Sequence, residues 1–392
     1  SVNDIEVSNK KVLVRVDFNV PLDAEQKINN DKRIKSALPT IKYLIDHHAS
    51  VILLSHLGRP KGKVVPELSL EPVAKHLSKL LGENVIMMND CIGKRVNEDI
   101  GRMKPGEIVL LENTRFHPEE KKNDPEFAKQ LASLGDIFIN DAFGTAHRAH
   151  ASNVGLANIL PSAIGFLVEK ELKYLKQQLG DPQKPFTAIF GGVKVSGKIE
   201  LIKEVMKKAD NILIGGAMMF TFYKALGYSV GKSLVEEDKL ELAKNLLELS
   251  KKKGVDIVLP VDTVIAKEPQ KNAEFKTVSV EKIPNGWMGL DIGEKTIKKF
   301  KRIINESKTV VWNGPMGMFE IDNFAHGTYS VAQTLADFDG ITIIGGGDSA
   351  AAVEKIGLEN RMTHISTGGG ASLEMLAGKE LPGIAVIPER NG

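Results

Sequence analysis

The chain has 392 residues, of which 42% are apolar and 26% are charged, and its 52 lysines and arginines nearly balance its 50 aspartates and glutamates. This composition excludes a disordered or fibrous protein, and the balanced charge gives no support to a nucleic acid or an anionic membrane as partner. The length predicts about two or three domains.

Short β-branched runs alternate with amphipathic segments along the whole chain. The first half has predicted strands at 11–16, 50–55, 84–88, 107–111 and 136–140, with predicted helices that include 38–47, 70–81 and 125–133. The second half has predicted strands at 187–190, 211–214, 255–260, 309–311 and 341–344, again with helical segments between them. Apolar strands separated by helices indicate parallel sheets covered on both faces. Two such sets predict an α/β protein of two doubly wound, Rossmann-like parallel-sheet domains.

The boundary between the two sets is predicted near residues 168–179. This segment has helical periodicity and is followed by Gly180 and Pro182, which end a helix. No low-complexity linker separates the halves, so we expect a helical hinge to join them.

Nothing in the residues suggests secretion or membrane insertion. The single cysteine, Cys91, excludes an internal disulfide framework and favours a reducing compartment. The most apolar stretch, 154–168, is interrupted by Asn158 and Pro161 and is shorter than the ~20 residues of a membrane span. Residues 1–6 lack the basic flank and apolar run of a signal peptide. We therefore expect a cytoplasmic protein.

Arginines are concentrated in the first half of the chain. Seven of the ten lie within the first 148 residues: Arg15, Arg33, Arg59, Arg95, Arg102, Arg115 and Arg148. Arg59, Arg115 and Arg148 follow predicted strands, and ligands of open α/β sheets bind at the carboxyl ends of strands. Surface salt bridges would explain one such arginine, but several at corresponding strand ends favour a site for a small polyanion, because the guanidinium fork binds phosphate and carboxylate in bidentate fashion.

Glycine-rich turns in the second half follow predicted strands and precede predicted helices. They lie at 191–198, 345–349 and 368–374. Such turns let backbone amides approach phosphate oxygens at a helix N-terminus. Tight turns that need glycine only for their geometry would explain one or two of the three.

Two segments approach the mononucleotide P-loop pattern without completing it. Gly192–Lys198 has Ile199 in place of the serine or threonine that would bind Mg²⁺, and Gly227–Ser233 is one residue short. Asp348 is then the expected metal carboxylate. His147 and His150 lack the further ligands of a zinc site.

Six motifs resemble those of the phosphoglycerate kinase family, in the family's order and spacing, over essentially the whole chain. They are 15–22 (RVDFNVPL), 55–60 (SHLGRP), 111–117 (LENTRFH), 191–198 (GGVKVSGK), 311–317 (VWNGPMG) and 345–349 (GGGDS). The resemblance implies a domain for 3-phosphoglycerate or 1,3-bisphosphoglycerate, formed by 1–167 with 379–392, and a domain for ADP or ATP with Mg²⁺, formed by 168–378. It further implies a monomer with no nucleic-acid or membrane partner.

The resemblance also implies site residues. Those expected to hold the triose phosphate are Asp17, Phe18, Asn19, Arg33, His56, Leu57, Gly58, Arg59, Arg115 and Arg148. Those expected to contact nucleotide are Lys198, Gly215, Leu290, Asn313, Pro315, Glu320, Gly346, Gly347, Asp348 and Ser349, with Asp348 at the metal. Arg33, Lys194 and the amides around Gly369 are expected to surround the phosphoryl group in transfer.

The chemistry of this reaction fits the residues. The acceptor is a carboxylate that is already ionised at neutral pH, so no general base is required, and transfer depends on positioning and on cations. An acyl phosphate is prone to hydrolysis, so we expect hinge closure to exclude water first.

Two other classes are weighed against this one. A nicotinamide-dependent dehydrogenase would need a G-x-G-x-x-G fingerprint after the first strand, which is absent from the sequence. A non-catalytic hinged binding protein would share the two domains, but it has no use for Lys194 beside three glycine turns.

Overall fold

The computed structural model describes residues 1–389, apart from the side chains of Gln177 and Gln178. It divides into two compact units. Unit 1 comprises Ser1–Lys173 and the segment from Glu380 onward, and unit 2 comprises Tyr174–Lys379. The sequence-based division was at 167/168 and 378/379.

Unit 1 is built on a six-stranded parallel sheet. Its strands are β1 (Lys11–Arg15), β2 (Ser50–Leu54), β3 (Val85–Met87), β4 (Ile108–Leu110), β5 (Ile137–Asn140) and β6 (Ser162–Ile164), in the order β3-β4-β2-β1-β5-β6. Side chains along β1 alternate between two hydrophobic cores, with Val12 and Val14 in one and Leu13 in the other. Both faces of the sheet are therefore buried, as the apolar strand sequences require.

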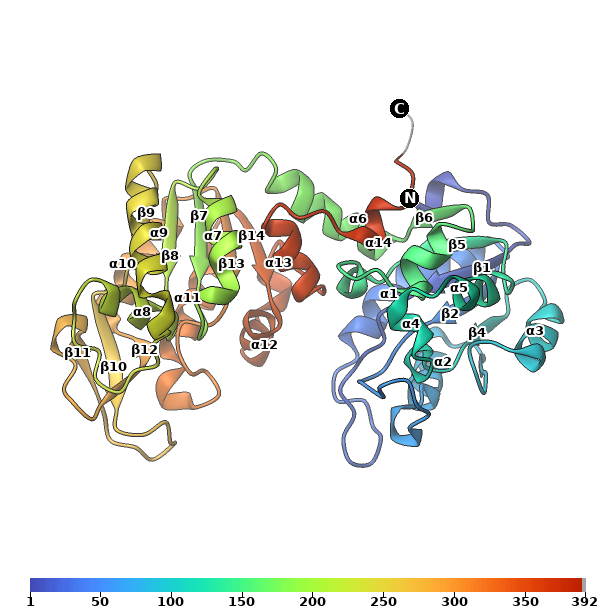
Figure 1. Cartoon of the computed structure of the whole chain (residues 1–392), viewed down its shortest axis with the longest axis horizontal. Helices are drawn as coiled ribbons and strands as arrows, with labels where there is room; N and C mark the ends of the chain where they lie inside the picture. The colour runs from blue at the N-terminus through green and yellow to red at the C-terminus, as the bar shows by residue number, and fades with distance from the viewer. Residues whose placement is uncertain (390–392) are drawn as a thin grey trace. The chain divides into compact units, whose positions relative to one another are not determined.

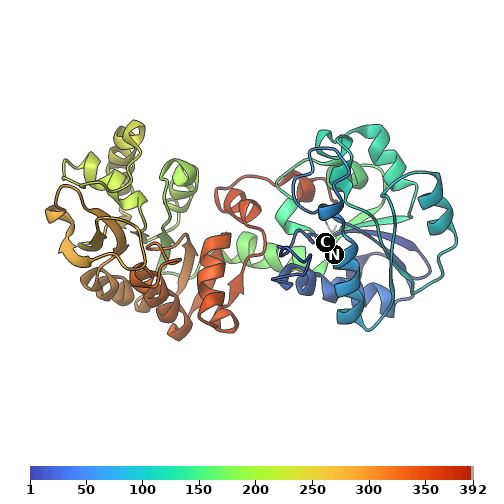
Figure 2. The ribbon, with the colours of Figure 1, turned by 90° about the horizontal axis from the view of Figure 1, so that it is seen from below.

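Helices lie on both faces of this sheet (Figures 1 and 2). They are α1 (Lys32–Asp46), α2 (Glu71–Leu81), α3 (Lys94–Gly101), α4 (Glu119–Lys122), α5 (Pro125–Ala132), α6 (Phe166–Leu172) and α14 (Pro382–Ala385), with the short turns η1 (Val2–Asp4), η2 (Pro66–Leu68), η3 (Thr114–Phe116), η4 (Phe143–Thr145) and η5 (Ala151–Gly155). The helix predicted at 38–47 begins at Lys32 in the structure, nearly two turns before the predicted start. Pro39 lies inside α1, and the buried Ile34 and Ala37 continue its apolar face toward the N-terminus.

The C-terminal segment packs on unit 1 beside β5. The Gly383 amide donates to the Ala146 carbonyl at 2.9 Å, and the buried Asn140 side-chain amide donates to the Gly383 carbonyl at 2.7 Å. A Cβ on Gly383 would lie 3.1 Å from the Ala146 backbone, so a glycine suits this close approach.

Unit 2 contains a second six-stranded parallel sheet. Its strands are β7 (Phe186–Phe190), β8 (Asn211–Ile214), β9 (Asp256–Val258), β13 (Thr309–Asn313), β14 (Ile341–Gly345) and β15 (His364–Ile365), in the order β15-β14-β13-β7-β8-β9. The helices of this unit are α7 (Ile199–Val205), α8 (Met218–Ala225), α9 (Leu240–Lys253), α10 (Glu294–Asn305), α11 (His326–Asp337), α12 (Gly347–Lys355) and α13 (Gly370–Leu376). Short turns are η6 (Lys173–Gln178), η7 (Ser196–Lys198), η8 (Glu237–Lys239), η9 (Val280–Lys282), η10 (Asp322–Phe324) and η11 (Glu359–Arg361).

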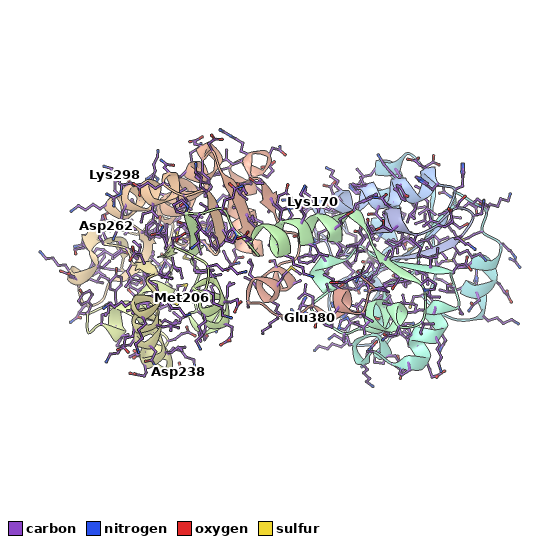
Figure 3. All side chains as sticks on the ribbon, turned by 90° about the horizontal axis from the view of Figure 1, so that it is seen from above. Lys170, Met206, Asp238, Asp262, Lys298 and Glu380 are labelled. Carbon is purple, nitrogen blue, oxygen red and sulfur yellow. The ribbon has the colours of Figure 1, made fainter. Side chains whose placement is uncertain are left out.

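A small antiparallel sheet of unit 2 was not predicted. It consists of β10 (Asp262–Ala266), β11 (Phe275–Ser279) and β12 (Met288–Ile292), in the order β11-β10-β12. Asp262 at the start of β10 accepts hydrogen bonds from the amides of Lys295 and Thr296 and so caps α10. Figure 3 marks Asp262 and, on the exposed face of α10, Lys298.

The predicted architecture of two doubly wound parallel-sheet domains is confirmed. All ten predicted strands are present, with ends within two residues of those expected. The helical segment expected between the domains is α6, continued by η6. The helix predicted after the glycine turn at 368–374 is α13, and α14 follows it. Within residues 1–389, no helix combines the length and the apolar character that crossing a membrane would demand.

Candidate active site

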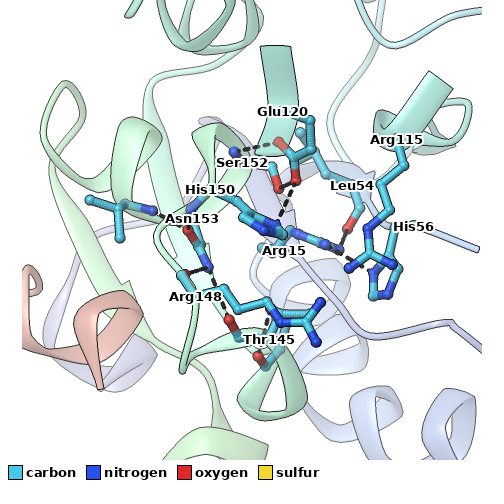
Figure 4. Close-up of polar contacts among 12 residues, drawn as sticks. Arg15, Leu54, His56, Arg115, Glu120, Thr145, Arg148, His150, Ser152 and Asn153 are labelled. Carbon is cyan, nitrogen blue, oxygen red and sulfur yellow. Dashed lines mark hydrogen bonds and ion pairs between the residues drawn. The ribbon is translucent and has the colours of Figure 1, made fainter. Parts of the chain in front are cut away.

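The arginines of unit 1 gather at the carboxyl end of its sheet. Arg15 is the last residue of β1, Arg59 follows β2, Arg115 lies in η3 after β4, and Arg148 follows β5. Because all these strands are parallel, their carboxyl ends share one edge. Figure 4 shows part of the resulting polar cluster.

Arg15 determines which ring nitrogen of His56 carries the proton. The Arg15 guanidinium is buried, donates to the carbonyls of Val16 (2.6 Å) and Leu54 (3.2 Å), and lies 3.1 Å from His56 Nδ1. A guanidinium carries donors only, so His56 Nδ1 accepts and the ring proton is on Nε2. Burial, followed by the charges of Arg15 and Arg115, holds the pKa of His56 well below its usual value. His56 is therefore a neutral hydrogen-bond donor through Nε2.

A chain of hydrogen bonds joins Arg33 to Arg115. Arg33 Nη1 donates to the Asn19 carbonyl (3.0 Å) and lies 3.1 Å from an oxygen of Asp17. The Asn19 side-chain oxygen accepts from the Gly58 amide at 2.8 Å, and the Gly58 carbonyl accepts from Arg115 at 2.9 Å. The structure thus brings five of the expected triose-phosphate residues into one network.

Glu120 supplies a buried negative charge beneath the arginines. Its carboxylate accepts from the Ser152 amide (2.9 Å) and hydroxyl (2.6 Å), and it lies 3.7 Å from His150 Nδ1. Despite this carboxylate, burial and the charges of Arg15, Arg115 and Arg148 lower the pKa of His150 to about 3. Burial likewise lowers the pKa of Arg115 to about 10, with Arg15 and Arg148 adding to the effect.

The remaining expected residues of unit 1 differ in exposure. Arg59 and Arg148 are exposed, whereas the side chains of Phe18 and Leu57 belong to the hydrophobic core. Phe18 and Leu57 can therefore contact a ligand only through their backbone.

In unit 2, glycine turns meet where β7 and β13 end side by side. The Gly191 amide donates to the Asn313 carbonyl (3.0 Å), the Gly192 amide to the Pro315 carbonyl (2.8 Å) and the Gly216 amide to the Met316 carbonyl (2.9 Å). From β7 the chain proceeds to β8 on one side, while β13 pairs on the other. This is the topological switch point at which doubly wound sheets bind ligands.

Lys198 bridges the two strand ends. Its ammonium donates to the carbonyls of Gly191 (2.6 Å) and Asn313 (2.9 Å), which leaves one of its three N–H groups for another acceptor. Burial lowers the pKa of Lys198 to about 8, and the charge of Asp348 acts in the opposite direction. Lys198 therefore remains mostly charged at neutral pH.

The glycine turn at 345–349 forms the N-terminus of α12. Asn313 Nδ2 donates to the Gly345 carbonyl (2.8 Å), and Ser349 Oγ accepts from the Gly314 amide (2.6 Å). Gly347 and Asp348 are exposed in the first turn. Ser349 is buried, and its hydroxyl binds the Gly314 backbone amide. The sequence did not indicate this structural role.

Four of the residues expected to contact nucleotide are connected through the segment after β13. The Met316 carbonyl accepts from the Gly216 amide, and the Met318 amide donates to the Leu290 carbonyl of β12 at 2.8 Å. Gly215, Leu290 and Pro315 are thereby tied to one segment, which continues to the exposed Glu320.

Of the three residues expected at the transferring group, Arg33 belongs to unit 1 and Lys194 and Gly369 to unit 2. Lys194 is exposed in the turn after β7. Gly369 precedes α13 with a φ of 46°, a left-handed conformation that favours glycine.

Sequence reasoning missed Arg15 and Glu120 as members of the site. Both are buried charged residues in direct or electrostatic contact with expected ligand-binding side chains. For Arg15 a signal was present, since a charge at the end of an otherwise apolar strand needs buried partners.

Fold and site together define the class: a two-domain α/β phosphotransferase. The family model of phosphoglycerate kinase matches residues 2–379. The chain belongs to the phosphoglycerate kinase family.

Individual relatives agree over the full length. The chain is 59% identical over 391 residues to phosphoglycerate kinase of Chlorobium phaeobacteroides, covering 99% of this chain and 98% of that protein. It is 56% identical over 390 residues to that of Moorella thermoacetica, covering 100% and 99%. The solved structure of the Coxiella burnetii enzyme matches with a TM-score of 0.89 at 41% identity, covering 98% of this chain and 97% of that one.

The activity follows from the family. The chain is a kinase of glycolysis and gluconeogenesis that transfers a phosphoryl group reversibly between 1,3-bisphosphoglycerate and ADP to give 3-phosphoglycerate and ATP. The predicted family, reaction and enzyme class are confirmed, and the comparisons favour neither the dehydrogenase nor the binding protein.

Proposed function

We propose that unit 1 binds the phosphoglycerate and that unit 2 binds the nucleotide with Mg²⁺. The observation that carries this assignment is the hydrogen-bonded network from Arg33 through Asn19 and Gly58 to Arg115. It joins Arg33 of α1 to Arg115 at the carboxyl end of the sheet, where Arg59 and Arg148 also follow strands. A molecule bearing phosphate and carboxylate groups gains bidentate hydrogen bonds from such arginines.

In unit 1 the roles divide by chemistry. Arg33, Arg59, Arg115 and Arg148 neutralise the phosphate and carboxylate charges. His56 donates from Nε2 without adding charge, because Arg15 occupies its other nitrogen. Asp17 is the one carboxylate among the residues expected to hold the triose phosphate, and it accepts a hydrogen bond from the substrate hydroxyl.

In unit 2 the glycine turns receive the nucleotide phosphates. Backbone amides of Gly346 and Gly347 and the free N–H of Lys198 point to phosphate recognition at the start of α12. Asn313 and Ser349 hold this turn in place. The segment that links Gly215, Leu290, Pro315 and Glu320 receives the adenosine.

Asp348 fits a magnesium ion. Its carboxylate is exposed in the first turn of α12, and its charge is felt by Lys198. Mg²⁺ is held in such sites by one or two carboxylates together with the substrate phosphates. The bound ion would neutralise charge on the nucleotide phosphates.

Arg33, Lys194 and the amide of Gly369 stabilise the phosphoryl group in transfer. The acceptor carboxylate is ionised at neutral pH and needs no base, so these groups act by neutralising charge on the equatorial oxygens.

All of these groups belong to one chain, which supports a monomer. The single cysteine supports a cytoplasmic location, and the balanced charge supports the absence of nucleic-acid and membrane partners.

Two substitutions test the division of labour by calorimetric titration. Arg59→Ala should weaken 3-phosphoglycerate binding at least tenfold and leave Mg²⁺-ADP binding within a few-fold. Asp348→Asn should do the reverse. A coupled assay with ATP and 3-phosphoglycerate reports activity of the same proteins. If either substitution weakens both ligands equally, the assignment is wrong.

A further inference from the structure

Asp90, Cys91 and His117 form a cluster in unit 1 that phosphoryl transfer does not use. Asp90 and Cys91 lie between β3 and α3, and His117 follows η3. One carboxylate oxygen, the thiol sulfur and one imidazole nitrogen all lie within 4.8 Å of one another. Asp90 and His117 are 27 residues apart in the sequence, so two separate chain segments bring three different metal-ligating groups together.

The contacts within the cluster are direct. Asp90 Oδ1 lies 2.7 Å from His117 Nε2 and accepts from the Cys91 amide at 2.6 Å. Cys91 is buried in the hydrophobic core with Phe127. The centroid of the His117 ring lies 5.2 Å from the centroid of the Phe127 ring. The positions of the sulfur and the ring are therefore set by packing and not by the ionic contact alone.

The cluster is open to solvent on one side. The side chains of Asp90 and His117 are 46% and 25% exposed, whereas Cys91 is buried. A cation from solvent would meet the carboxylate and the imidazole first and the sulfur beneath them.

The combination of donors selects a class of cation. Thiolate, imidazole and carboxylate are the protein ligands of Zn²⁺, and three of them with water in the fourth position make an open tetrahedral site. Bond lengths of about 2.0–2.3 Å place tetrahedral ligands roughly 3.4–3.8 Å apart, so side-chain rotations suffice to reach this geometry. Mg²⁺ and Ca²⁺ prefer oxygen ligands and are disfavoured here.

We propose that Asp90, Cys91 and His117 bind one zinc-class divalent cation, with water as the fourth ligand. On binding, the Cys91 sulfur exchanges its proton for the metal and the proton passes to solvent. The proton of His117 Nε2 that hydrogen-bonds to Asp90 leaves this nitrogen as the metal binds, and the neutral ring keeps its N–H on Nδ1. One bond from Nε2 and one from the Asp90 carboxylate to the cation then replace the hydrogen bond. The bound ion cross-links the loop after β3 to the segment that carries Arg115.

Cobalt(II) provides the decisive probe, because thiolate coordination to Co²⁺ produces a charge-transfer absorption in the near ultraviolet. Cys91 is the only cysteine of the chain, so such a band can arise from no other residue. Titrating the metal-free full-length protein with Co²⁺ should give this band with a stoichiometry of one, and Zn²⁺ should abolish it. A folded protein that shows no band overturns the proposal.

Variants separate the site from a lone thiol. His117→Gln and Asp90→Asn change partly exposed side chains and should each weaken Co²⁺ binding at least tenfold, whereas His48→Gln, an exposed histidine of the same unit, should not. Zn²⁺ should raise the thermal unfolding midpoint of the parent protein and not that of His117→Gln. If the band is unchanged in both His117→Gln and Asp90→Asn, the cysteine binds alone and the three-residue site is wrong.

Discussion

His56 and His150 are two histidines that the fold keeps uncharged inside an arginine-rich site. Arg15 donates to His56 Nδ1, and His150 is surrounded by Arg15, Arg115 and Arg148. A protonated imidazole at either position would add positive charge in a buried place. Their neutrality lets the site contribute hydrogen bonds to an anion without further repulsion among the cations.

Because the pKa of His150 falls from 6.5 in the unfolded chain to about 3 in the folded protein, the unfolded state binds more protons between these pH values. The contribution of His150 to folding stability is therefore fully present above pH 6.5 and is lost as the pH falls toward 3. Each such proton changes the free energy of unfolding by roughly 1.4 kcal/mol per pH unit.

The measurement is chemical unfolding of the parent protein and His150→Gln between pH 4 and 8. The difference in free energy of unfolding between the two proteins should be constant above pH 6.5. At lower pH the parent protein should lose stability relative to His150→Gln. Asp141 and Asp291, whose pKa values burial raises to about 6 and about 8, give the opposite slope. They are present in both proteins and cancel in the difference. A difference that does not vary with pH would contradict the assignment.

Arg33 is the residue whose loss should reduce turnover most relative to stability. Its guanidinium is partly exposed and contacts Asp17 and Asn19, so removal leaves the core intact. Arg33→Ala should lower kcat by about 10²–10³, which corresponds to roughly 3–4 kcal/mol of lost transition-state stabilisation. Steady-state kinetics with an unfolding curve for the same protein measure both quantities.

Two further variants sharpen this test. Arg33→Lys should restore only part of the rate, because an ammonium cannot bridge two groups as a planar fork does. Arg95→Ala changes an exposed arginine of α3 in the same unit and should keep kcat within two-fold or so of the parent protein. Normal turnover by a folded Arg33→Ala protein would remove Arg33 from the transfer step.

At the scale of elements, the glycine turns of unit 2 are required by packing as well as by ligand approach. Gly216 has a φ of +63°, and a Cβ there would lie 2.3 Å from the Gly192 nitrogen. Gly254, which follows α9, has a φ of +67° but open space around the same position. The two glycines share a left-handed backbone conformation that would strain any other residue, and they differ in their steric surroundings.

Gly216→Ala should therefore destabilise the protein far more than Gly254→Ala. The second substitution should cost about 1–2 kcal/mol, the penalty of a left-handed alanine, and the first should exceed that value because backbone atoms must also separate. Urea unfolding of both variants makes the comparison. Equal losses of unfolding free energy in the two variants would contradict this prediction. They would show that the backbone where β7, β8 and β13 meet can move apart at little cost.

The elements also show where sequence reasoning succeeds. The central strands are apolar runs such as 50–54, and burial on both faces makes such runs recognisable. The strand β11 is largely exposed and has no such run, and β15 has two residues, so neither carries the signal. The motifs indicated which turns face a ligand. Arg15 begins the first motif, but the motif gave it no role, and Glu120 lies outside all six motifs. The importance of both comes from contacts between segments distant in sequence.

For the whole molecule, the proposed placement of substrates on separate units has a measurable consequence. Direct transfer requires the carboxylate of one ligand to reach the terminal phosphate of the other, and water must be absent at that moment. Small-angle scattering should therefore give a smaller radius of gyration with 3-phosphoglycerate and Mg²⁺-ADP together than with either ligand alone. This pair cannot react, so the complex persists during measurement. An unchanged radius would contradict closure for this chain.

The docking of Gly383 on Ala146 and Asn140 makes unit 2 an insertion within unit 1. During translation, all of unit 2 is synthesised before the segment from Glu380 onward that completes unit 1. A chain terminated before this segment would contain the whole of unit 2, yet the buried Asn140 side-chain amide would lack its acceptor, the Gly383 carbonyl. Completion of unit 1 thus waits until the whole of unit 2 and the segment from Glu380 onward have been synthesised.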